Sequence, residues 1–190
     1  MTPPSTPVPT GPDSTAEAAL AGLLRARGAD TIDHPGGTLG AHLERVQRRL
    51  AGLGAPPVLQ LAGRAHAVYG TDGFDVALLT LAERPLLTGI VGPDAERVVY
   101  RYGACERART WSTLADDGRV WDRFTGEVSE PAPDELRAFA DLSLVNELDV
   151  AEHSPGFLDR YGDLLRRLAG SWEPLLSPAV VADARQVLGA

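Results

Sequence analysis

Apolar side chains recur every three or four residues along most of this chain, which is the spacing of one face of an α-helix. Between Thr38 and Gly54 the apolar residues stand at that spacing opposite three arginines. Proline and acidic residues stand where many of these segments begin, and glycine stands where many of them end, as is typical of helix boundaries. The pattern predicts an all-α fold, with helices over 14–27, 38–53, 58–69, 76–81, 84–91, 93–102, 133–150, 156–168 and 178–188.

Two segments depart from this pattern. Near 117–130 an Asp117-Gly118 turn is followed by alternating apolar and polar residues, which predicts a small β-hairpin or an irregular insertion. Residues 1–14 are dominated by proline, serine and threonine, and we expect them to form a flexible arm. The remaining residues, 15–190, are then expected to form a single helical domain. A domain of this length can bury a sufficient hydrophobic core without disulfides or structural metals.

Charge and composition narrow the function classes. The net charge is −8, and all 18 basic residues are arginine, so we expect neither nucleic-acid binding nor attachment to an anionic membrane. No apolar run is long enough for a membrane span and no secretory leader is evident, which makes cytoplasmic localisation the expectation. The only cysteine, Cys105, excludes an internal disulfide and a cysteine-based zinc cluster.

Two histidines carry the candidate chemistry. His42 shares the apolar face of its predicted helix with Leu39 and Val46, and His66 lies in the most apolar helix of the chain. Both imidazoles are therefore expected to point inward from consecutive helices. A buried imidazole needs a partner, and a carbonyl, a carboxylate or a metal ion would each satisfy it.

Other residues are weaker candidates. His34 precedes the same helix as His42, and Tyr69 follows His66 at a spacing that places both on one helix face. Arg84 would bind an anion or form an internal salt bridge. Thr71 and Trp121 are candidate substrate contacts, although core packing is the more common use of a tryptophan.

The motif around these histidines resembles the HD-domain superfamily. The closest pattern is that of a little-characterised HD-like family, His-x-Gly-x-Thr-Leu-x-x-His-Leu followed by Leu-Ala-Gly-x-x-His-x-x-Tyr-Gly-Thr-x-x-Phe. The matching residues here are His34, Gly36, Thr38, Leu39, His42, Leu43, Leu61, Ala62, Gly63, His66, Tyr69, Gly70, Thr71 and Phe74. The likeness extends over about residues 30–150 and implies an HD-like helical bundle that acts on a small metabolite.

The resemblance also implies a metal site. His42 and His66 would be ligands, and a residue of the late helix would complete the set: Asn146, Asp149 or, as a third option, Asp141. HD phosphohydrolases carry aspartate directly after the second histidine, but here that residue is Ala67. This difference argues against a dinuclear centre and leaves a mononuclear site for zinc, iron or manganese.

Two functions follow from this reading. The first is a small-molecule enzyme with hydrolase- or lyase-type chemistry, in which His34, His66, Tyr69 and Arg84 are the catalytic candidates and the centre is either metal-dependent or a metal-free histidine acid–base pair. The alternative is a non-catalytic ligand-binding or scaffold protein that lost the HD metal centre with Ala67. No other cofactor is expected, and the sequence leaves a homodimer open.

Overall fold

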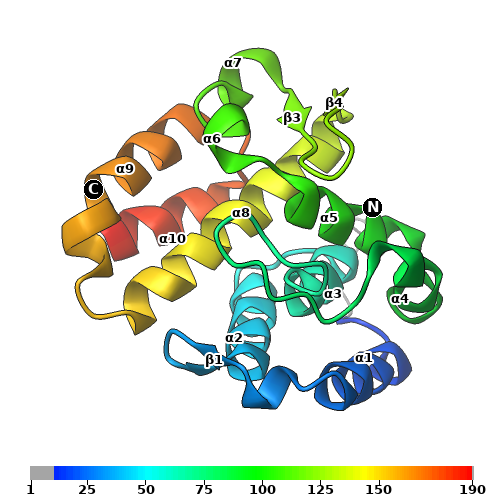
Figure 1. Cartoon of the computed structure of the whole chain (residues 1–190). Helices are drawn as coiled ribbons and strands as arrows, with labels where there is room; N and C mark the ends of the chain where they lie inside the picture. The colour runs from blue at the N-terminus through cyan, green and yellow to red at the C-terminus, as the bar shows by residue number, and fades with distance from the viewer. Residues whose placement is uncertain (1–10, 190) are drawn as a thin grey trace, which may run out of the picture.

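The all-α prediction is confirmed by the computed structural model, which describes residues 11–189 (Figure 1). The helices are α1 (Ser14–Ala26), α2 (Leu39–Gly52), α3 (Pro57–Ala65), α4 (Arg84–Val91), α5 (Pro93–Ala104), α6 (Arg107–Thr110), α7 (Leu114–Asp117), α8 (Pro133–His153), α9 (Phe157–Trp172) and α10 (Pro178–Leu188). Single 3₁₀ turns lie at Ala29–Thr31 and Leu81–Glu83. The predicted arm over 1–14 lies mostly outside the described residues.

Helix α8 is the central element of the fold. It runs through the middle of the molecule, between α2 and α3 on one side and α9 and α10 on the other (Figure 1). Its side chains are buried around almost the whole circumference, and they include Asp141, Asn146, Glu147 and Asp149 as well as apolar residues. Most polar groups buried in a protein core are hydrogen-bonded, so α8 brings hydrogen-bonding groups into the core.

Two antiparallel hairpins complete the structure. Strands β3 (Val120–Trp121) and β4 (Val128–Ser129) confirm the hairpin predicted near 117–130. Strands β1 (Asp33–His34) and β2 (Gly37–Thr38) form a second hairpin, mostly between the first two predicted helices. Its turn requires glycine at position 36, because φ is +77° there and a Cβ atom would lie 2.7 Å from the His153 Cβ.

Three local predictions need correction. Residues 76–81 do not form a helix, because the amides of Leu78 and Leu79 both bond the Val68 carbonyl instead. The third helix ends at Ala65 rather than Tyr69, and residues 66–69 form a turn. The side chain that caps α1 is Asp13, which accepts from the Thr15 amide, whereas the sequence predicts Ser14 or Thr15 as the cap.

Within residues 11–189, none of the helices combines the length and the apolar character needed to cross a membrane.

Candidate functional site

The imidazoles of His42 and His66 meet in the interior. His42 projects from α2 and His66 from the end of the neighbouring α3, and the two Nε2 atoms are 3.2 Å apart. Both residues are almost fully buried, at 1% and 2% exposure. Helical spacing predicted that both imidazoles point inward, and they do point inward and meet there.

The outer nitrogen of each ring has an acceptor. His66 Nδ1 donates to the Gly63 carbonyl at 2.8 Å, and His42 Nδ1 donates to Asp149 Oδ2 at 2.7 Å. A carbonyl and a carboxylate accept only, so the proton of each neutral ring lies on Nδ1 and the lone pair on Nε2. Burial, followed by the neighbouring His42, lowers the pKa of His66 to about 3, so this ring is neutral near pH 7. If the His42 ring is neutral as well, two lone pairs face each other.

Asn146 adds a third acceptor to this pair. Its Oδ1 lies 2.9 Å from His42 Nε2, and its Nδ2 donates to Glu147 Oε1 at 3.0 Å. The Glu147 carboxylate orients the amide, because a flipped amide would direct oxygen against oxygen. With His42 neutral, three acceptor atoms converge without a proton among them. Such a cluster needs a cation, which is either a proton on His42 Nε2 or a metal ion.

Asp149 lies on the far side of the His42 ring. Besides His42 Nδ1, its carboxylate accepts from Arg45 Nε and Nη2, both at 2.9 Å. Burial alone would raise the pKa of Asp149, but the bonds from His42 and Arg45 outweigh it and hold that pKa well below its usual range. The carboxylate therefore orients the His42 ring, as carboxylates do behind metal-binding histidines.

A cavity of about 230 Å³ opens beside these groups. Its lining comes from the β1–β2 hairpin, the segment after α3, the start of α6, and helices α2, α5, α8 and α9: His34, Pro35, His42, His66, Ala67, Thr71, Asp72, Gly73, Phe74, Tyr102, Arg107, Asn146, Glu147, Val150 and Phe157. His34 stacks on His42 with ring centroids 4.1 Å apart, and Phe74 packs edge-on against the His34 ring. Burial and the neighbouring His42 lower the pKa of His34 to about 4. Its Nδ1 is buried without a hydrogen-bond partner among residues 11–189.

The polar wall of the cavity was not foreseen from the sequence. Arg107 donates to Glu147 Oε1 and to the Tyr102 hydroxyl, both at 2.9 Å, and its amide donates to Asp72 Oδ2. The Tyr102 ring packs edge-on against His66, with centroids 5.0 Å apart. These residues share no local sequence motif. The only feature of the sequence that could have pointed to this polar wall is the position of Glu147 directly after Asn146.

Three predicted site residues lie elsewhere. The Tyr69 hydroxyl donates to Glu96 Oε1, and Arg84 pairs with both oxygens of the same carboxylate. Because α3 ends at Ala65, the turn carries Tyr69 away from His66, and Tyr102 occupies that place. Trp121 lies under the Arg109 guanidinium at 3.4 Å and is not among the lining residues. Thr71 is buried and does line the cavity.

The donor set is compatible with a single metal ion. In the described part of the chain no three His, Cys, Asp or Glu side chains are grouped to hold one, so the candidate set is two imidazoles and the Asn146 amide oxygen. Two ligand atoms each about 2.1 Å from a metal lie roughly 2.9–3.4 Å apart at tetrahedral or octahedral angles. The separations of 3.2 and 2.9 Å from His42 Nε2 fall in this range.

Comparison with known proteins adds one match. The family model described as "Domain of unknown function (DUF6817)" matches residues 23–107, a stretch that contains His34, His42 and His66 but neither Asn146 nor Asp149. No curated protein and no solved structure matches the chain.

Proposed function

We propose that this chain is a small-molecule enzyme of HD-like fold, with hydrolase- or lyase-type chemistry at a mononuclear metal centre. His42 Nε2, His66 Nε2 and Asn146 Oδ1 would hold one divalent ion of zinc, iron or manganese. The observation that carries the proposal is the convergence of these three acceptors, with the other polar end of each side chain already bonded elsewhere.

The residues around the centre have separable roles. A bound ion would supply Lewis acidity toward a substrate oxygen or a water molecule. Asp149 holds the His42 proton on Nδ1 and keeps Nε2 free. His34, neutral and stacked over His42, accepts a proton from the substrate or from water. The methyl group of Ala67 lines the cavity where the HD resemblance would place an anionic ligand, so one more position is open to substrate.

Cavity size and lining restrict the substrate. A volume of about 230 Å³ lies below the range of roughly 300–1,000 Å³ that is typical of pockets for drug-sized ligands. Phe74 and Phe157 supply apolar contacts, whereas Asp72, Glu147 and Arg107 supply polar ones. The cavity therefore suits a compact polar metabolite with a small apolar part.

A second candidate keeps the same residues without a metal. A proton on His42 Nε2 would bond Asn146 Oδ1 and His66 Nε2, and the negative charge of Asp149 would stabilise the imidazolium. His42 would then act as a general acid in metal-free chemistry. Ala67 and the neutral donor set also leave the non-catalytic ligand-binding or scaffold protein as a third interpretation.

Metal loading of purified protein tests the proposal. We expect about one equivalent of zinc, iron or manganese by mass spectrometry after loading and dialysis, and its loss in His66→Ala and Asn146→Ala. Gln60→Ala is the matched control, since this buried polar side chain bonds the Ala55 carbonyl, lies outside the cavity lining and should leave occupancy unchanged. Circular dichroism establishes that each variant is folded.

The opposite result separates the other two candidates. If wild type takes up no metal, the proposal fails, and nitrogen-15 NMR of the histidines then decides between the remaining two. An imidazolium at His42 near pH 7 would support metal-free acid–base chemistry. A neutral His42 without metal would support the non-catalytic interpretation.

A further inference from the structure

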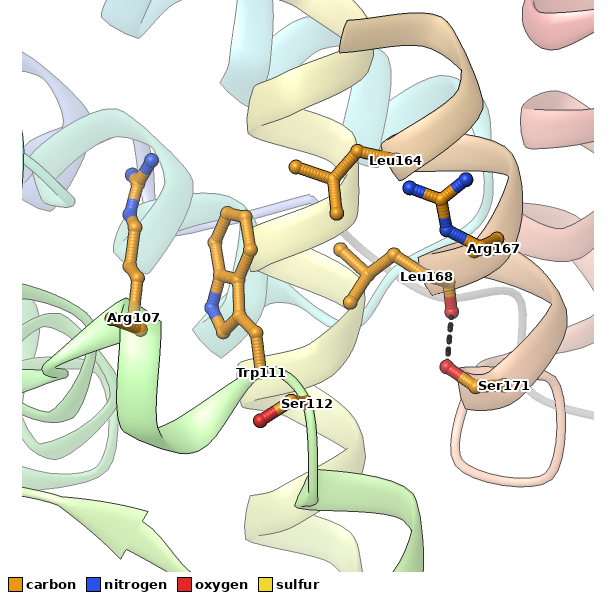
Figure 2. A pocket seen from close by; sticks show the side chains of 8 residues that line it. Arg107, Trp111, Ser112, Leu164, Arg167, Leu168 and Ser171 are labelled. Carbon is orange, nitrogen blue, oxygen red and sulfur yellow. Dashed lines mark hydrogen bonds between the residues drawn. The ribbon is translucent and has the colours of Figure 1, made fainter.

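A second hollow lies between α6 and α9. It has a volume of about 520 Å³ and is lined by residues from the start of α6 to Ser112 and by one face of α9: Arg107, Ala108, Trp111, Ser112, Leu164, Arg167, Leu168 and Ser171. Figure 2 shows the Trp111 ring facing Leu164 and Leu168, with Arg107 and Arg167 at opposite ends. We call this hollow the Trp111 groove.

The walls of the groove are apolar and firmly held. Trp111 packs at right angles against the buried Trp172, with ring centroids 5.8 Å apart, and Trp172 Nε1 donates to the Trp111 carbonyl. Leu164 on the opposite wall is 46% exposed, so a large apolar side chain faces solvent inside a concavity. Covering such a surface with an apolar group is favourable, at about 25 cal/mol per Å².

The charges in the groove are all positive. No aspartate or glutamate lines it, although the chain as a whole has a net charge of −8. Arg107 is paired with Glu147 and lies 4.7 Å from the Trp111 ring. Arg167 forms no salt bridge with any carboxylate in residues 11–189, which leaves its guanidinium available to an anion.

We infer that the Trp111 groove binds an amphipathic organic anion, namely an aryl or alkyl carboxylate. The apolar body lies between Trp111 and the two leucines, and the carboxylate pairs with Arg167. Apolar walls select against small inorganic anions, and the absence of lining carboxylates selects against amines. The volume accommodates a bicyclic aromatic acid.

The groove shares a residue with the histidine cavity. Arg107 lines both, and it bonds Glu147, which accepts from Asn146, whose amide oxygen faces His42. An occupant beside Arg107 thus contacts one end of a hydrogen-bond chain that reaches the proposed catalytic centre. Binding in the groove does not depend on the catalytic proposal, so it is tested on metal-free protein.

Calorimetry with 2-naphthoate and its neutral analogue 2-naphthylmethanol tests the inference on the full chain. We expect naphthoate to bind with a dissociation constant below about 1 mM, and the alcohol to bind about fivefold more weakly. Arg167→Gln should weaken naphthoate by a similar factor and abolish the preference for the acid. Arg160→Gln is the matched control, because Arg160 lies two turns earlier on α9, outside the groove lining, and should change nothing.

A second variant tests the apolar wall. Leu164→Ser should weaken both probes, since the side chain is exposed and its loss leaves the core intact. Equal binding of acid and alcohol, with Arg167→Gln unchanged, would overturn the anion assignment, and so would the absence of any binding. Concentration-dependent dimerisation of wild type that Leu164→Ser abolishes would show instead that a second copy of the chain covers the groove.

Discussion

Replacing Asp149 by asparagine should separate the stability of this protein from its metal affinity. In wild type the carboxylate accepts from His42 Nδ1 and twice from Arg45. An asparagine of the same shape can instead donate from its amide nitrogen to His42 Nδ1. The ring proton would then move to Nε2, where it occupies the lone pair that faces His66 and Asn146.

Two effects of different size follow. Loss of charge-assisted bonds to Arg45, which is only partly buried, should lower the free energy of unfolding by about 1.5–3 kcal/mol. Loss of the carboxylate behind a metal-binding histidine should weaken metal affinity by about 10- to 100-fold. The second effect arises from the proton position and does not require unfolding.

A similar ion pair on the same helix supplies the control. Arg49 bonds both oxygens of Asp183, at 2.7 and 3.0 Å, and also pairs with Glu152, with no histidine involved. Asp183→Asn should therefore reduce stability, by less than Asp149→Asn because Glu152 still pairs with Arg49, and leave metal affinity unchanged. Urea denaturation of metal-free protein measures the first quantity, and competition with a chromophoric chelator measures the second.

The reasoning is refuted if Asp149→Asn binds metal as tightly as wild type. It is also refuted if Asp183→Asn loses as much metal affinity, because the loss would then reflect general destabilisation.

Three further predictions concern single residues. Ala67→Asp would add an anionic group to the cavity lining and should tighten metal binding about tenfold or more; unchanged affinity would contradict the HD-like alignment at this position. Burial raises the pKa of Cys105 to about 11, so at pH 8 the native thiol should react with iodoacetamide at least ~100-fold more slowly than in urea-unfolded protein. Burial also raises the pKa of Asp141 above its ordinary 3.8, so its stabilising contribution is complete below about pH 4 and declines as pH rises through the folded-state pKa. Asp141→Asn should thus gain stability relative to wild type between pH 4 and pH 7 in urea titrations, and a constant difference would exclude this linkage.

Helical spacing was sufficient to place most helices and to direct His42 and His66 inward. These are local properties, because a helix turns by the same angle at every residue and an apolar stripe defines its buried face. The β3–β4 hairpin could also be predicted from the sequence, since its turn and its alternating residues lie within a dozen positions. The position of Tyr69 could not be predicted, because the end of α3 at Ala65 depends on the Val68 carbonyl accepting from Leu78 and Leu79.

The partner of the histidines on α8 was decided by tertiary packing. The sequence offered Asp141, Asn146 and Asp149, and nothing local distinguishes them. In the fold, Asn146 and Asp149 bond opposite nitrogens of one His42 ring, because three residues of helix rise about 4.5 Å and so straddle an imidazole. Asp141 points elsewhere and accepts from the Ser177 amide at the start of α10. The angle at which α8 crosses α2 decides that Asn146 and Asp149 lie on opposite sides of the His42 ring. These helices are about a hundred residues apart in sequence, so their crossing angle is fixed only by tertiary packing.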